Sequence, residues 1–69
     1  MEFPKITLKA ARVNAGLTQK AAAAALGVNV STLQNYETGA TVPTWDMVQL
    51  IAKVYRFPKE FISFGIESA

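Results

Sequence analysis

The stretch that decides the fold begins at Gly16-Leu17-Thr18-Gln19, passes through Leu26-Gly27-Val28 and ends at Tyr36-Glu37-Thr38-Gly39. Thr18 is a typical helix N-cap, because its hydroxyl can accept a hydrogen bond from a backbone N–H of the first turn. Gly27 is typical of a helix end, where glycine adopts a left-handed backbone at little cost. The stretch therefore predicts two short helices joined by one tight turn.

Helical signals surround this turn. A first helix is expected after the N-cap Thr7, and it stops at the glycine that opens the stretch. The second runs from Gln19 to Leu26 and is rich in alanine, the residue with the highest helix propensity. The third is capped by Asn29 or Ser31 and ends just before the last glycine of the stretch.

The carboxyl-terminal third predicts two further helices. A fourth follows the cap Thr44, because apolar residues then recur at helical spacing. These residues are Trp45, Val48, Ile51, Ala52 and Tyr55. Pro58 opens a fifth helix, Lys59 to Phe64, which Gly65 closes, and no segment alternates long enough to indicate a strand. We therefore expect an all-α fold, a compact five-helix bundle, with residues 1–69 as one domain and its core at about 7–64.

Length and charge bound the possible functions. A chain of 69 residues has room for one modest hydrophobic core. Its net charge of +2 and pI of about 9.2 permit a polyanionic partner without requiring one. Because the sequence has no cysteine, it predicts neither disulfides nor thiolate metal sites, which suits the reducing cytoplasm.

The sequence argues against catalysis and against a membrane location. It has no His or Cys, its carboxylates are scattered, and it has no phosphate-binding glycine loop or metal-ligand spacing. We therefore expect no enzyme activity, no cofactor, no metal and no small-molecule ligand. Polar residues interrupt the longest uncharged stretch, Ala21 to Tyr36, and Met1 to Leu8 has no apolar run of signal-peptide length. Neither a membrane span nor a secretion signal is expected.

The third helix has two unlike sides, as a rotation of about 100° per residue shows. Its core side carries Thr32, Leu33 and Tyr36, and its outer side carries Ser31, Gln34 and Thr38, flanked by Val30 and Asn35. Gln and Asn amides can pair with adenine N6 and N7, and valine can contact a thymine methyl group. An ordinary solvated face is the alternative, but such faces usually carry Lys and Glu. The neutral strip therefore favours contact with DNA bases.

The order and spacing of several short motifs resemble the Cro/cI-type (XRE) helix-turn-helix family. The motifs are Leu17-Thr18-Gln19, Leu26-Gly27-Val28, Ser31-Thr32-Leu33, Tyr36-Glu37-x-Gly39, Pro43 and Ile51-Ala52-Lys53. The resemblance covers about Thr7 to Phe64. It implies a lambda-repressor-like bundle of four or five helices and sequence-specific operator binding as a transcriptional regulator. A repressor of the phage or prophage type, acting as a dimer, is the expected form.

The resemblance also implies roles for single residues. Its usual base-contacting positions fall on Val30, Ser31, Gln34 and Asn35. Gln19 matches a residue that typically binds phosphate, and the first turn of a helix favours an anion. Further phosphate candidates by location are Lys20, Asn29, Thr41 and, more weakly, Lys9. On this interpretation Asn35→Ala relaxes the preference at one base pair, whereas Gln19→Ala weakens binding to all sequences about equally.

Arg12 and Glu37 occupy positions where the family often pairs an arginine of the first helix with a glutamate of the third. We expect a structural pair that fixes the angle between the two helices. The alternative role, Arg12 bound to phosphate, is the weaker of the two. A partly buried pair of this kind specifies geometry more than it adds net stability.

Two departures from the family pattern affect these expectations. The third helix, Val30 to Thr38, has no Lys or Arg, so the counterion-release part of DNA affinity must come from elsewhere. Arg56 stands where the family often has a helix-ending glycine, and we expect it to adopt a left-handed conformation at a cost of about 1 kcal/mol. Together with the second helix, whose alanines leave it nearly without charge, these departures predict weak binding by an isolated monomer.

The carboxyl end suggests a dimer. Phe57 and Phe61 are expected in the core, which leaves Ile62, Phe64 and Ile66 as an exposed patch for a second copy. A symmetric homodimer would bind an inverted repeat with half-sites roughly 10 bp apart. The alternative is that this tail folds back over the first helix.

A protein-interaction module on the same scaffold, of the antitoxin-like or anti-repressor-binding kind, is the second candidate function. The neutral third helix and the apolar carboxyl end are compatible with it, because a fold does not determine its function. Affinity for random duplex DNA at low salt distinguishes the two, since a pure protein binder shows no salt-dependent affinity.

Overall fold

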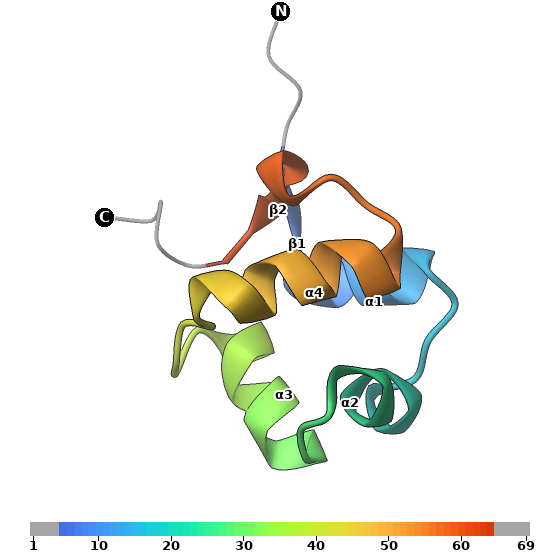
Figure 1. The fold of residues 1–69 in the computed structure, drawn as a ribbon, viewed down its shortest axis with the longest axis vertical. Helices are drawn as coiled ribbons and strands as arrows, with labels where there is room; N and C mark the ends of the chain where they lie inside the picture. Colours follow the sequence, from blue (N-terminus) through green and yellow to red (C-terminus); the bar gives the residue numbers. More distant parts are fainter. Residues whose placement is uncertain (1–4, 65–69) are drawn as a thin grey trace, which may run out of the picture.

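A computed structural model describes residues 5–64 and shows a mostly helical fold (Figure 1). The elements in chain order are β1 (Ile6–Thr7), α1 (Leu8–Asn14), α2 (Gln19–Leu26), α3 (Val30–Thr38), α4 (Trp45–Tyr55), the 3₁₀ turn η1 (Lys59–Phe61) and β2 (Ile62–Ser63). In Figure 1, α4 crosses the middle of the molecule in front of α1. The two strands and η1 lie above these helices, and α2 and α3 lie below them.

Each of the four α-helices begins where a side chain caps it. In every case the capping oxygen accepts a hydrogen bond from the backbone N–H three residues later. The caps are Thr7, Thr18, Asn29 and Thr44. The predicted caps of α1, α2 and α4 are confirmed, and Asn29 is the cap of α3.

The predicted fifth helix is wrong, and so is the expectation of no strand. Only η1 is helical there, and β2 then pairs in parallel with β1, with Ile6 opposite Ile62 and Thr7 opposite Ser63. The sequence from Ile62 to Phe64 is apolar–polar–apolar, and a strand places its first and third residues on one side. Ile62 and Phe64 are thereby both turned into the core, where they are 1% and 5% exposed. This three-residue alternation is too short to recognise without the pairing partner.

The core lies between α1, α2, α3, α4 and β2. Its buried residues are Leu8, Ala11, Ala22, Ala23, Leu26, Leu33, Val48, Ile51, Tyr55, Ile62 and Phe64. Two alanines of the α2 run, Ala22 and Ala23, are fully enclosed, and α2 packs on both α3 and α4. Small side chains at these positions allow the helices to approach closely, as the crossing of α2 and α3 requires.

The predicted exposed patch does not exist at Ile62 and Phe64, because both side chains are buried in the core. The residues expected to be core, Phe57 and Phe61, are instead half-buried. Ile66 lies outside the described residues. Strand β2 packs against α1, so the described chain folds back over the first helix at this point. Burial of apolar area against α1 and β1 is available to this segment without a second copy.

Arg56 ends α4 in the left-handed region, with φ 54° and ψ 46°, as predicted. It is the only non-glycine residue with positive φ between residues 5 and 64. A side chain with a Cβ atom makes this conformation unfavourable by about 1 kcal/mol. The position therefore retains the geometry of a glycine C-cap without having a glycine.

Candidate nucleic-acid interface

Helices α2 and α3 are joined by a turn over residues 27–29. Gly27 adopts φ 74°, and the N–H of Val28 donates to the carbonyl of Ala23 at 3.0 Å. The N–H of Gly27 donates to the carbonyl of Ala24 at 3.2 Å, so two of the carbonyl groups that the end of α2 leaves open are satisfied. Asn29 then caps α3 directly. With a turn this short, α3 starts next to α2 and its direction is set by the turn rather than by a loop.

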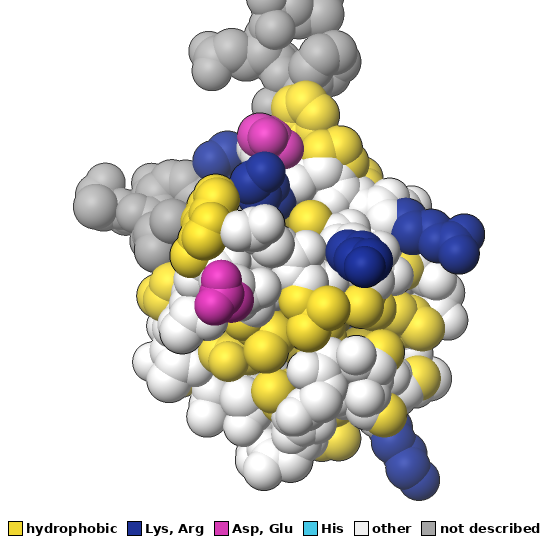
Figure 2. All heavy atoms as spheres, in the orientation of Figure 1, with side chains coloured by type: hydrophobic (Ala, Val, Ile, Leu, Met, Phe, Trp, Pro, Cys, Tyr) yellow, Lys and Arg dark blue, Asp and Glu magenta, His cyan; other side chains and the backbone are white. Residues whose placement is uncertain are grey.

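The outer side of α3 is exposed and neutral. Ser31, Gln34 and Asn35 are exposed and Val30 is half-buried, while Leu33 on the inner side is completely buried. Figure 2 shows the region over α3, in the lower part of the view, in white and yellow, with neither dark blue nor magenta side chains. The side chains on this surface offer hydrogen-bond donors, acceptors and one methyl-bearing group, which are the groups that bind base edges.

Arg12 and Glu37 form an ion pair that joins α1 to the last turn of α3. The Nε of Arg12 donates to Oε2 of Glu37 at 2.6 Å, and the two side chains are only 8% and 5% exposed. Arg12 also donates through Nη1 to the carbonyl of Leu17 at 2.8 Å. The guanidinium thus holds both α3 and the segment that enters α2.

The same carboxylate is linked to the surface of α3 through Gln19. Nε2 of Gln19 donates to Oε1 of Glu37 at 3.0 Å. Oε1 of Gln19 accepts from Nε2 of Gln34 at 3.2 Å. A continuous series of hydrogen bonds therefore runs from Arg12 through Glu37 and Gln19 to Gln34, from the protein interior to the exposed side of α3.

The residues considered for phosphate contact do not share one environment. Lys9 and Lys20 are exposed on α1 and α2, and Thr41 is exposed in the loop after α3, where its N–H donates to the carbonyl of Asn35 at 3.2 Å. The Oδ1 of Asn29 accepts from the Thr32 N–H and also from the hydroxyls of Ser31 and Thr32. Its oxygen is thus occupied by protein, and only the amide donor of Asn29 is available to an anion.

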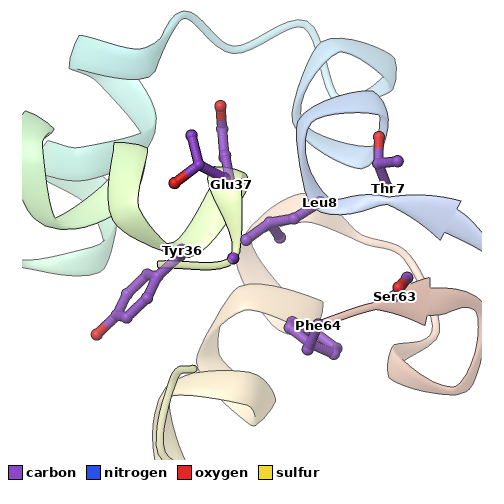
Figure 3. A pocket seen from close by; sticks show the side chains of 8 residues that line it. Thr7, Leu8, Tyr36, Glu37, Ser63 and Phe64 are labelled. Carbon is purple, nitrogen blue, oxygen red and sulfur yellow. The ribbon is translucent and has the colours of Figure 1, made fainter. Parts of the chain in front are cut away.

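Glu37 also lines a cleft of about 320 Å³, which lies between the paired strands and the end of α3 (Figure 3). Thr7 and Ser63 border it from the strands, and the Tyr36 ring points away from them.

The part of the chain described by the structure holds no group of three His, Cys, Asp or Glu residues that could bind a metal ion. No helix within residues 5–64 is long and apolar enough to cross a membrane.

In a comparison with known protein families, the family model described as a helix-turn-helix domain matches residues 6–61. The chain belongs to the helix-turn-helix domain family. The match spans every helix described above, and the family is of the Cro/cI (XRE) type. Comparisons with curated proteins and with solved structures find no match.

In this helix-turn-helix domain, two contacts of the site were not predicted from the sequence. These are the hydrogen bonds that Gln19 makes with Glu37 and with Gln34. Gln19 was considered only as a phosphate ligand, because its place in the first turn of α2 is a local feature. Its partners lie in another helix, and no local pattern in the sequence identifies them. The contact with Gln34 also changes the expectation for Gln19, which is now linked to a residue considered for base contact.

Proposed function

We propose that this domain is a sequence-specific regulator of transcription, of the phage or prophage repressor type, that places α3 in the major groove of double-stranded DNA. The observation that supports the proposal most directly is the exposed, uncharged side of α3 on a helix-turn-helix scaffold. A helix carrying Ser31, Gln34 and Asn35 on its outer side can bind base edges without bringing a formal charge into the groove.

The base contacts are assigned to the outer side of α3. Gln34 and Asn35 pair with adenine, Ser31 donates to or accepts from a base edge, and Val30 contacts a thymine methyl group. Gln34 and Asn35 are exposed, and neither amide is enclosed by the protein. These contacts supply the specificity, while affinity depends on the contacts to phosphate.

The phosphate contacts are assigned to groups at the edges of α2 and α3. Lys20 and Lys9 provide positive charge, and the Asn29 amide and the Thr41 hydroxyl provide neutral donors. The second N–H of Gln19 adds a donor near the start of α2. Because α3 has no Lys or Arg, two lysines carry most of the salt-dependent affinity, and a monomer should bind weakly.

A homodimer on an inverted repeat would double these contacts, with half-sites about 10 bp apart. The large apolar side chains exposed near the end of α3 are Val42 and Trp45, at 49% and 63%. Trp45 borders a groove of about 350 Å³ whose apolar lining includes Val48. Seating each Trp45 in the partner's groove gives a two-fold contact, and the core residues Val48, Ile62 and Phe64 line that groove in part.

Selection from a random duplex library, followed by titration of the selected sequence at several salt concentrations, tests the proposed function. We expect a selected inverted repeat, a steep loss of affinity as salt rises, and a loss of about 1–3 kcal/mol for Asn35→Ala at one base pair. Lys20→Met is the matched control, since it should weaken all sequences equally. Failure to enrich any sequence, with no salt-dependent DNA affinity, would instead favour the protein-interaction module.

Sedimentation of the wild type and of Trp45→Gln, with and without the selected duplex, tests the dimer. The wild type should bind as two copies per duplex, and Trp45→Gln should shift binding towards one copy. One wild-type copy bound to an asymmetric site would rule out the dimer and leave DNA binding intact.

A further inference from the structure

We propose that Glu37 sets the direction of two side-chain amides in series, Gln19 and then Gln34, and that this makes Gln34 selective for adenine over guanine. The inference rests on the proposed function, because it concerns how the same face of α3 discriminates between bases. The hydrogen-bond donor and acceptor atoms of Glu37, Gln19 and Gln34 determine this direction.

The series starts at a group that can only accept. Glu37 is paired with the Arg12 guanidinium through Oε2, and both side chains are almost fully buried. A carboxylate in such a pair has acceptor atoms and no donor. Whatever side chain meets its second oxygen, Oε1, must therefore present an N–H or O–H group.

That requirement fixes the orientation of Gln19. Its amide meets Oε1 of Glu37 at 3.0 Å through Nε2. Turning the amide over would place its carbonyl oxygen against the carboxylate, which replaces a charge-assisted hydrogen bond with a repulsion. With Nε2 directed at Glu37, Oε1 of Gln19 is directed at Gln34, one turn earlier in α3.

The orientation of the Gln19 amide in turn fixes the orientation of the Gln34 amide. Oε1 of Gln19 is an acceptor, so Gln34 meets it through Nε2, at 3.2 Å. One of the two N–H bonds of Gln34 is thereby used within the protein. The groups that remain for a ligand are one N–H donor and the carbonyl oxygen.

This remaining pair matches adenine and mismatches guanine. In the major groove adenine presents the N6 amino donor and the N7 acceptor, so the carbonyl and the single N–H of Gln34 are both satisfied. Guanine presents two acceptors, O6 and N7. A glutamine could bind both only through two N–H groups, and the hydrogen bond to Gln19 leaves only one.

Asn35 provides an internal comparison. It is exposed on the same helix, and among residues 5–64 hydrogen bonds reach only its backbone carbonyl, from Thr38 and Thr41, and not its side-chain amide. Its amide can turn over freely and keeps both N–H groups. The hydrogen-bond series should therefore affect selectivity at the base pair read by Gln34 and leave the one read by Asn35 unchanged.

The test replaces Gln19 by Met, which keeps a similar length and removes both hydrogen bonds. Base pairs read by Gln34 and Asn35 are first located with Gln34→Ala and Asn35→Ala on the selected duplex. Dissociation constants are then measured with adenine and with guanine at each position. We expect the wild type to prefer adenine at the Gln34 position by about tenfold or more, and Gln19→Met to reduce that ratio at least about fivefold. The ratio at the Asn35 position should not change.

Lys20→Met is the matched control, because Lys20 is the next residue of α2 and is exposed. It should lower affinity for both bases and leave the adenine-to-guanine ratio unchanged at both positions. If Gln19→Met also lowers affinity without changing either ratio, Gln19 acts only on phosphate and the inference is overturned, while DNA binding stands. If the Met variant does not fold, the same ratios are measured with Gln19→Asn, whose side chain is too short to join both partners.

A measurement without DNA separates failure of this inference from failure of the proposed function. In nuclear magnetic resonance spectra of the free protein, the shift separation of the two Nε2 protons of Gln34 should exceed that of an unbonded glutamine amide, whose two protons already differ because rotation about the C–N bond is slow. Gln19→Met should reduce the separation to the unbonded value, and Lys20→Met should not. A separation in the wild type equal to that of an unbonded amide would show that the amide of Gln34 is not held, whatever the protein binds.

Discussion

Arg12 and Glu37, which lie in different helices, are joined by a hydrogen-bonded ion pair of 2.6 Å between Nε and Oε2. Each partner has a further bond: Arg12 donates to the Leu17 carbonyl, and Glu37 accepts from Gln19. Removing either side chain therefore leaves a buried charge and a second polar group without a partner. The pair connects α1, the entry to α2 and the end of α3, which together position the outer side of α3.

A double-mutant cycle on this pair should show strong coupling. Arg12→Ala and Glu37→Ala should each lower the free energy of unfolding by about 3 kcal/mol, because each leaves an uncompensated buried charge. The double variant should lose clearly less than the sum. Urea unfolding of the four proteins measures the coupling, and strict additivity would mean that the two side chains do not interact.

The exposed pair of Lys59 and Glu60, at 3.5 Å, is the matched control for that cycle. Its two side chains are 36% and 67% exposed, so solvent screens the attraction. The same cycle there should give a coupling much smaller than the one between Arg12 and Glu37.

Arg56→Gly should stabilise the protein. The residue has φ 54°, which glycine adopts freely, and the expected gain is about 0.5–1 kcal/mol after the extra chain entropy of glycine in the unfolded state. Arg56→Ala is the control, because it removes the side chain beyond Cβ but keeps the backbone strain. A thermal midpoint of Arg56→Gly at or below that of Arg56→Ala would contradict the strain argument.

Substitutions in β2 should act mainly on folding. Ile62→Ala should lower the free energy of unfolding by about 2–4 kcal/mol, because Ile62 is 1% exposed in the core. Val13→Ala, at a side chain 60% exposed on α1, should change it by less than about 0.5 kcal/mol. Urea unfolding provides the comparison. If Ile62→Ala instead changed only the sedimentation of the folded protein, the side chain would belong to an interface.

Tyr55 should make stability fall at alkaline pH. The pKa of its hydroxyl is raised to about 12, mainly by burial and next by the nearby Glu37 charge, with Arg12 partly opposing them. In the unfolded chain a tyrosine titrates near pH 10. Between about pH 10 and 12 the unfolded state therefore loses its proton before the folded state does, so this contribution is complete below pH 10 and is lost as pH rises towards 12.

Comparison of the wild type with Tyr55→Phe isolates this effect. The hydroxyl has no hydrogen-bond partner within the described part of the chain, so the variant should be no less stable at pH 7. From pH 9 to pH 12 the wild type should lose about 1–2 kcal/mol more than the variant. Parallel pH profiles of the two proteins would show that Tyr55 is not the group responsible.

Local signals in the sequence were sufficient to predict the helices α1 to α4. Three of the four caps and the glycine after α2 depend on hydrogen bonds and backbone preferences within a few residues, so a short window contains their causes. The left-handed Arg56 was expected because the family often has a helix-ending glycine at this position. The neutral outer side of α3 could likewise be predicted, since a helical rotation assigns each residue to a side. The Arg12–Glu37 pair was expected only because the motif resembles a known family.

Tertiary structure decided the rest. The parallel pairing of Ile6 with Ile62 brings together the two ends of the described chain, and each strand alone is too short to show a period of two. The hydrogen bond between Gln19 and Gln34 was also decided by the tertiary structure. It exists only because the turn over residues 27–29 places two helices side by side. By itself the sequence determined which residues are helical and which lie on the outer side of α3. Which side chain meets which was decided by packing, because a contact between distant residues depends on the position of every element between them.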